Sequence, residues 1–157
     1  MEKVPMTPEG HAALHAELVQ LKNVERLKIS REIGVAREHG DLRENAEYHA
    51  AKEKQGMVEA RIAEIEDHIA RADVIDPKHY VGDTVKFGAY VTLEDTDSGD
   101  IKKYRIIGPD EADIKKGTIS ATSPVARALV GKRVGDEVTV QAPGGERVYE
   151  LKKLAWS

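Results

Sequence analysis

Apolar residues recur at helical spacing in the first half of the chain and alternate with polar residues in the second half. The first half contains two narrow apolar seams, and charged residues fill most of the remaining positions. The members of the seams are Leu14, Leu18, Leu21, Val24, Leu27, Ile29, Ile33 and Ala36 in one, and Val58, Ile62, Ile65, Ile69 and Ala72 in the other. Such seams are typical of helices that pair as a coiled coil. Strong helix formers dominate this half, so we expect two long helices.

The expected helices have recognisable ends. Thr7 followed by Pro8 is typical of a helix cap and first helical residue. Between the seams lie residues 39–42, where Gly40 can adopt the left-handed conformation that ends a helix and Asp41 can cap the next one. A short connection favours an antiparallel pair. Each helix would have about 30 residues, so the hairpin would be ~45 Å long and would project from the rest of the protein.

The second half shows the signals of a small sheet. Apolar and polar residues alternate from Val85 to Leu93, as in a half-buried strand. Further expected elements are a turn at 95–100, a returning strand at 101–107, a helix opened by Ser123-Pro124 and running to Leu129, and strands at 134–142 and 147–154. The composition changes near Pro77. We therefore predict an α+β protein with a coiled-coil domain at 1–76 and an antiparallel sheet domain with one short helix at 77–157.

Composition and charge narrow the class of protein. The 157 residues carry 24 Lys and Arg against 28 Asp and Glu, for a net charge of -4. The expected coiled coil holds a net -5 and the sheet domain +1, which argues against broad binding to nucleic acid. No apolar run has the ~20 residues of a membrane span, and no secretory signal is evident. The absence of cysteine excludes disulfides and thiolate chemistry. We expect a cytoplasmic protein without a membrane partner.

Acidic residues gather at the tip of the expected hairpin. Asp41, Glu44 and Glu47 follow one another at intervals of three residues. On a helix, residues three apart share a face, so the carboxylates of Asp41 and Glu44 can converge. Two carboxylates suit Mg²⁺ but do not complete its coordination, so a partner would have to supply the other ligands. The alternative is structural, because acidic residues in the first turn of a helix are favoured by the macrodipole and by capping.

The residues around these acids each have two interpretations. Arg37 and Lys52 flank the tip and could contact a backbone phosphate, although solvated helix faces carry such charges routinely. Tyr48 could stack on a base or pack across the tip. His39 and His49 could titrate near neutral pH, but no metal-ligand spacing links them, which favours ordinary tip residues.

The tip sequence resembles a known family. Residues 36–51, AREHGDLRENAEYHAA, resemble the tip signature of the bacterial transcript cleavage factors of the Gre family, the GreA type in particular. A second motif at 120–131, SATSPVARALVG, followed by Gly-Asp-Glu at 135–137, is similar to the same family. The resemblance covers essentially the whole chain. Arg43 stands where the family often has lysine.

The resemblance implies a fold and a function. It implies an N-terminal antiparallel coiled coil and a C-terminal domain similar to FKBP-type prolyl isomerases but without isomerase activity. That domain would dock on the rim of the secondary channel of RNA polymerase, and the coiled coil would enter the channel. Asp41 and Glu44 would help to hold a second Mg²⁺, shared in trans with the polymerase, and to orient the attacking water. Arg37 and Lys52 would contact the extruded RNA.

The implied protein is an accessory factor and not an enzyme by itself. It would act as a monomer, and it would stimulate RNA polymerase to cut the 3′ end of backtracked RNA, releasing short fragments. One alternative is a Gre-fold inhibitor that blocks the channel without stimulating cleavage; Asp41 and Glu44 are the residues that such an inhibitor would have altered. Two further alternatives are a stand-alone metal nuclease and a pure adaptor. The small number of metal ligands disfavours the nuclease.

Overall fold

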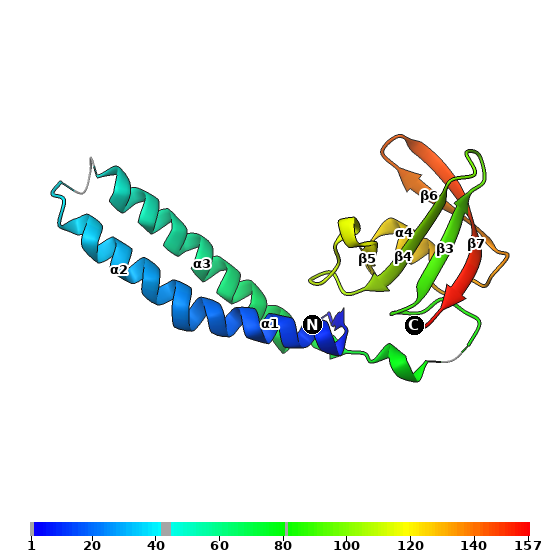
Figure 1. Cartoon of the computed structure of the whole chain (residues 1–157), viewed down its shortest axis with the longest axis horizontal. Helices are drawn as coiled ribbons and strands as arrows, with labels where there is room; N and C mark the ends of the chain where they lie inside the picture. The colour runs from blue at the N-terminus through cyan, green and yellow to red at the C-terminus, as the bar shows by residue number, and fades with distance from the viewer. Residues whose placement is uncertain (1, 42–44, 81) are drawn as a thin grey trace. The chain divides into compact units, whose positions relative to one another are not determined.

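A computed structural model describes residues 2–41, 45–80 and 82–157 of the chain (Figure 1). The chain divides into two compact units. One unit is the helical segment His11–Arg71, and the other combines the chain up to Gly10 with Ala72–Ser157. None of the described helices is long and apolar enough to cross a membrane.

The helical unit is an antiparallel hairpin. Its first arm consists of α1 (Pro8–Gln20) from His11 onward, a π-helical turn η1 (Leu21–Glu25) and α2 (Arg26–Arg37), and its second arm is α3 (Ala46–Ala70). In Figure 1, α3 runs back alongside α2. The start of α1 is as expected from the sequence, since the Gly10 backbone N–H donates to the Thr7 hydroxyl at 3.0 Å.

The buried seam of the hairpin matches the sequence prediction on α3 and departs from it on the first arm. Ile62 and Ile65 are buried on α3, as expected. Ala72, which was also expected in this helical seam, lies beyond the end of α3 in a short strand, β2 (Ala72–Val74). On the first arm, Val24 and Leu27 were expected in the seam, but their exposed fractions are 47% and 53%. The π-helical turn accounts for the difference, because its i→i+5 hydrogen bonds add one residue to a turn and shift the phase of the buried face. The seam resumes with Ile29, Ile33 and Ala36, all buried.

Ion pairs link the two arms along the surface of the hairpin. The Arg26 guanidinium donates to both carboxylate oxygens of Glu59 at 2.8 Å, and Lys22 lies 3.3 Å from Glu66. Nearer the start of the hairpin, the Arg61 guanidinium donates to Glu17 at 2.6 Å. This hydrogen bond lowers the pKa of the Glu17 carboxyl.

The second unit is built on a five-stranded sheet in the order β5-β4-β3-β7-β6. The strands are β3 (Tyr90–Asp95), β4 (Ile101–Ile107), β5 (Thr118–Ser120), β6 (Glu137–Ala142) and β7 (Gly145–Ala155). The prediction of a purely antiparallel sheet is wrong in one place, because β5 pairs with β4 in parallel. This strand has only three residues, which is too short to show a period-two pattern. A 3₁₀ turn, η3 (Ile114–Lys116), brings the chain round before it.

The core of this unit lies between the sheet and a short helix. Alternate residues of β3, Val91 and Leu93, are buried together with Leu129 at the end of α4 (Pro124–Leu129). The Ser123 hydroxyl caps α4 by accepting from the Ala126 backbone N–H at 3.3 Å, as the sequence predicts. The expected strand from residue 85 begins only at Tyr90, although Val85 and Ala89 before it are also buried in the core.

Two short strands from distant parts of the sequence complete this unit. β1 (Val4–Met6) pairs in parallel with β2 (Ala72–Val74). Beside them, the Thr7 backbone N–H donates to the Glu111 carboxylate at 2.8 Å, and the Thr7 hydroxyl also donates to it. The division of the structure therefore differs from the boundary expected at residue 76, because the first ten residues group with the sheet and not with the hairpin. Residues 77–79 form a further 3₁₀ turn, η2 (Pro77–His79).

Candidate functional site at the tip of the hairpin

The loop between α2 and α3 forms the tip of the hairpin. α2 ends at Arg37, and Gly40 has a φ of +108°, the left-handed conformation expected from the sequence. Asp41 follows it in the loop with its side chain exposed. Glu44 lies outside the described residues, so its place relative to Asp41 stays a prediction.

The helix after the tip starts later than the sequence suggested. The spacing of the acids predicts a helix that is capped by Asp41 and carries Glu44 and Glu47 on one face. In the structure α3 begins at Ala46, so Asp41 precedes the helix by several residues and does not lie on its face. Any convergence of Asp41 with other acids therefore depends on the path of the loop and not on helical spacing.

Asn45 caps α3, where the sequence pattern predicted a cap at Asp41. Its side-chain oxygen accepts from the Tyr48 backbone N–H at 3.0 Å, which satisfies one of the unpaired donors at the start of the helix. Its side-chain amide donates to the backbone carbonyl of Ala36, in the last turn of α2. Asparagine followed directly by helix-forming residues was the signal available in the sequence.

Asp41 lies beside a small hollow with a histidine and a second acid. The hollow is lined by His39, Asp41, Asn45, Ala46 and Glu47. The His39 Nε2 lies 3.5 Å from a carboxylate oxygen of Glu47. Within the described part of the chain, no group of three His, Asp or Glu side chains is placed to hold a metal ion. Carboxylates of the kind that Mg²⁺ prefers are thus present here, but a complete ligand set is not formed by the described residues.

The flanking residues occupy the surface on both arms of the tip. Tyr48 is half-buried and packs against the cluster of Ile29, Ile33 and Ala51, which supports the packing interpretation of this residue. The Arg37 guanidinium carbon lies 6.0 Å from the centre of the Tyr48 ring. Lys52 is exposed, two turns into α3, and its Nζ donates to Gln55 at 3.0 Å. Both cations face solvent near the tip, and their contact with RNA stays a prediction.

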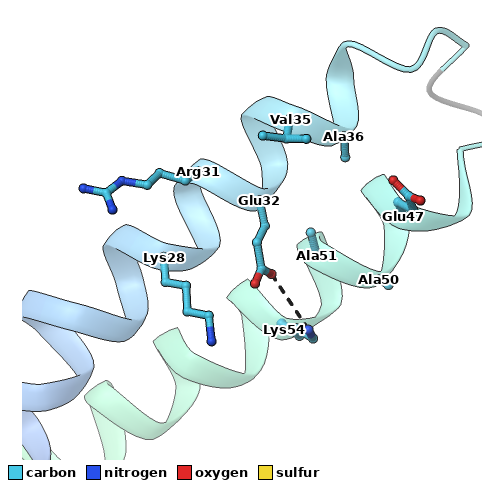
Figure 2. A pocket seen from close by; sticks show the side chains of 9 residues that line it. All are labelled: Lys28, Arg31, Glu32, Val35, Ala36, Glu47, Ala50, Ala51 and Lys54. Carbon is cyan, nitrogen blue, oxygen red and sulfur yellow. Dashed lines mark ion pairs between the residues drawn. The ribbon is translucent and has the colours of Figure 1, made fainter.

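A groove of about 570 Å³ runs between α2 and α3 just behind the tip (Figure 2). Its lining combines four apolar residues with a charged rim, namely Val35, Ala36, Ala50 and Ala51 with Lys28, Arg31, Glu32, Glu47 and Lys54. Glu32 and Lys54 form an ion pair at 3.8 Å between the two helices. The apolar pattern of the sequence does not reveal this groove, because Val35 lies outside the apolar seam and is 56% exposed.

Comparisons with known proteins give the family. Residues 4–74 match the family model described as "Transcription elongation factor, N-terminal", and residues 79–155 match "Transcription elongation factor, GreA/GreB, C-term". The chain belongs to the GreA/GreB family. The two matches together cover both units, and they confirm the family that the tip sequence and the motif at 120–137 indicate.

Relatives within the GreA/GreB family are similar over the full length. A protein of Hyphomonas neptunium named "Transcription elongation factor GreA" is 59% identical over 99% of both chains. A second of that name, from an Anaeromyxobacter species, is 58% identical over 99% of this chain and 94% of its own.

Solved structures of related factors cover the same length. GreA factor homolog 1 (Gfh1) of Thermus thermophilus is 28% identical over 98% of this chain and 99% of its own, with a TM-score of 0.45. A GreA/GreB factor from Nitrosomonas europaea is 19% identical over the same shares, with a TM-score of 0.43.

Proposed function

We propose that this GreA/GreB-family protein stimulates RNA polymerase to cleave the 3′ end of backtracked RNA. In this proposal the sheet unit docks at the rim of the secondary channel of the polymerase, and the hairpin enters the channel. The tip then completes an active site that the polymerase alone holds in part. The protein is an accessory factor, and the polymerase provides the nuclease activity.

The observation that carries the proposal is the position of Asp41. Its carboxylate is exposed in the loop that joins the two arms, at the end of the hairpin opposite to residues 11 and 71. The described residues around it do not complete a metal site. An acid in this position adds little to the packing of the hairpin, but it is the part of the hairpin best placed to reach into a partner.

The tip residues would act by holding and positioning. Asp41 and Glu44 would supply carboxylate oxygens to a Mg²⁺ ion, and the polymerase would supply the remaining ligands. When bound, this ion would supply the chemistry of two-metal hydrolysis, in which paired ions stabilise the attacking and leaving oxygens. The two carboxylates would also accept hydrogen bonds from the attacking water and so orient it. Arg37 and Lys52 would attract the phosphates of the extruded RNA.

The proposal is tested with a stalled, backtracked RNA polymerase complex. The wild-type protein is compared with the Asp41→Asn/Glu44→Gln double variant, which removes both negative charges and keeps the side-chain sizes. The 3′ RNA products are resolved on a gel in Mg²⁺ buffer. We expect short 3′ fragments from the wild type and a loss of at least about a hundredfold in rate from the variant, because charge on the metal ligands is lost.

Two controls complete this experiment. A reaction without polymerase should give no cleavage, and the double variant should compete with the wild type for the polymerase. Wild-type protein that binds the polymerase without stimulating cleavage would contradict the proposal and favour the channel-blocking inhibitor. Equal cleavage by wild type and variant would instead favour an adaptor that acts through its docking surfaces.

A further inference from the structure

The Asn45 side chain is bonded to both arms of the hairpin at once. Its oxygen accepts from the Tyr48 backbone N–H at 3.0 Å, in the first turn of α3. Its amide nitrogen donates to the carbonyl of Ala36, nine residues earlier in the last turn of α2. The same carbonyl accepts from the His39 backbone N–H at 3.1 Å. One half-buried side chain therefore satisfies backbone groups at the end of one helix and at the start of the next.

This pair of bonds closes the ends of the loop that carries Asp41. The cost of holding a loop in one arrangement depends on how its ends are fixed. With the hydrogen bond from the Asn45 side-chain amide to Ala36 in place, the last turn of α2 and the first turn of α3 are joined directly beside the loop. Without it, the start of α3 keeps its cap, but the link across the tip is lost.

We infer that Asn45 is a positioning residue for the tip acids, an inference that rests on the function proposed above. Catalysis by a group that must meet a partner's metal depends strongly on its placement, and a displacement of about 1 Å can cost two orders of magnitude in rate. Asn45 acts through the loop and does not itself touch RNA or metal. Its amide donor, rather than its capping oxygen, carries this role.

Asn45→Ser separates the two bonds. Serine is as good a helix cap as asparagine, so the bond from Tyr48 is kept. The shorter hydroxyl does not reach the Ala36 carbonyl, and the substitution introduces no charge at the tip. Ile62→Val is the matched control, because Ile62 is buried on α3 and its truncation weakens the hairpin without changing any tip residue.

The test combines two readouts on the full-length chain. The first is amide hydrogen exchange at His39, whose N–H donates to the Ala36 carbonyl. The second is a titration of each protein against the backtracked polymerase complex, giving a maximal cleavage rate and a half-saturating concentration. We expect Asn45→Ser to speed the exchange and to lower the maximal rate by about tenfold, with the half-saturating concentration changed by less than about twofold. Ile62→Val should keep the wild-type maximal rate.

Three results would overturn the inference. They are unchanged exchange at His39 in Asn45→Ser, a wild-type maximal rate in that variant, and an equal fall in rate in Ile62→Val, which would mean that hairpin stability alone is responsible. If the wild type itself fails to stimulate cleavage, the proposed function is wrong. The exchange measurement then decides whether Asn45 closes the loop.

Discussion

At the scale of single residues, this chain uses aspartate in two opposite ways. Asp41 is exposed at the tip, whereas the Asp95 side chain is only 3% exposed. Asp95 accepts from the backbone N–H groups of Asp97 at 2.9 Å and Ser98 at 3.2 Å, and the Arg147 guanidinium donates to it at 3.2 Å. Asp95 thus organises the turn between β3 and β4, a structural role inside the sheet unit.

Asp95 makes the stability of the sheet unit depend on pH. The backbone N–H groups, and then Arg147, lower the pKa of this carboxyl. Because the folded pKa lies below the unfolded value of about 3.9, the stabilisation is complete above that pH and is lost as the pH falls through the folded pKa. As the pH is lowered below about 4, we expect the thermal unfolding midpoint of the wild type to decrease. Over the same pH range, the midpoint of Asp95→Asn should decrease less steeply.

The matched control for this pH dependence is Asp97→Asn, at an exposed position in the same turn. Its midpoint should follow the wild-type pH profile between pH 7 and 3. An Asp95→Asn profile parallel to that of the wild type would show that Asp95 is not a source of the acid sensitivity.

At the scale of elements, the π-helical turn sets the register of the hairpin. The turn Leu21–Glu25 adds one residue to the first arm and so brings Ile29 and Ile33 onto the buried face. The helices, their antiparallel pairing and the cap at Thr7 could be predicted from apolar spacing and local chemistry. The extra residue could not, because the seam through Val24 and Leu27 has acceptable spacing in the sequence and only the pairing with α3 selects between the alternatives.

Deletion of single exposed residues tests this register. Removing Asn23 should convert the π-helical turn to an ordinary α-helical turn and change the free energy of unfolding by no more than about 1 kcal/mol. Removing Ser30 should cost about 2–5 kcal/mol. Without Ser30, either Ile33 leaves the buried face, or the π-helical turn closes to compensate and Ile29 leaves it instead.

The helical circular dichroism signal, followed through thermal unfolding, measures both deletions. We expect the thermal midpoint of the Asn23 deletion to be close to that of the wild type and the midpoint of the Ser30 deletion to be well below it. Equal losses from the two deletions would mean that the π-helical turn does not set the register.

At the tip, the end of the first helix could be predicted from the sequence, but the start of the second could not. The position of Gly40 and the end of α2 follow from local preferences, so they could be predicted. The sequence could not show whether Asp41 or Asn45 caps α3, because both residue types are good caps. The hydrogen bond from the Asn45 side chain to Ala36, across the loop, decides between them. The parallel strand β5 (Thr118–Ser120) could not be predicted either, because it is too short to have a pattern of its own and is defined only by its pairing with β4.

At the scale of the whole molecule, the family and the two units support different roles for the sheet unit and the hairpin unit. The sequence offers no candidate catalytic or metal-binding residues in the sheet unit, which includes both ends of the chain. The hairpin unit carries the tip, whose described residues do not form a complete metal site. The need for a partner to complete a metal site could be predicted from the two tip carboxylates, whereas the identity of that partner could be predicted only through the family resemblance.

If the tip acids share Mg²⁺ with RNA polymerase, the factor should change the Mg²⁺ dependence of transcript cleavage, and a Mg²⁺ titration measures this change. Cleavage rates of a backtracked complex are measured over a range of Mg²⁺ concentrations, without factor, with wild type, and with Asp41→Asn/Glu44→Gln at saturating concentration. We predict that wild type lowers the Mg²⁺ concentration for half-maximal rate by about tenfold or more, and that the double variant leaves it at the value without factor. An unchanged Mg²⁺ dependence with wild type, at any level of stimulation, would show that the tip acids do not share a Mg²⁺ ion with the polymerase.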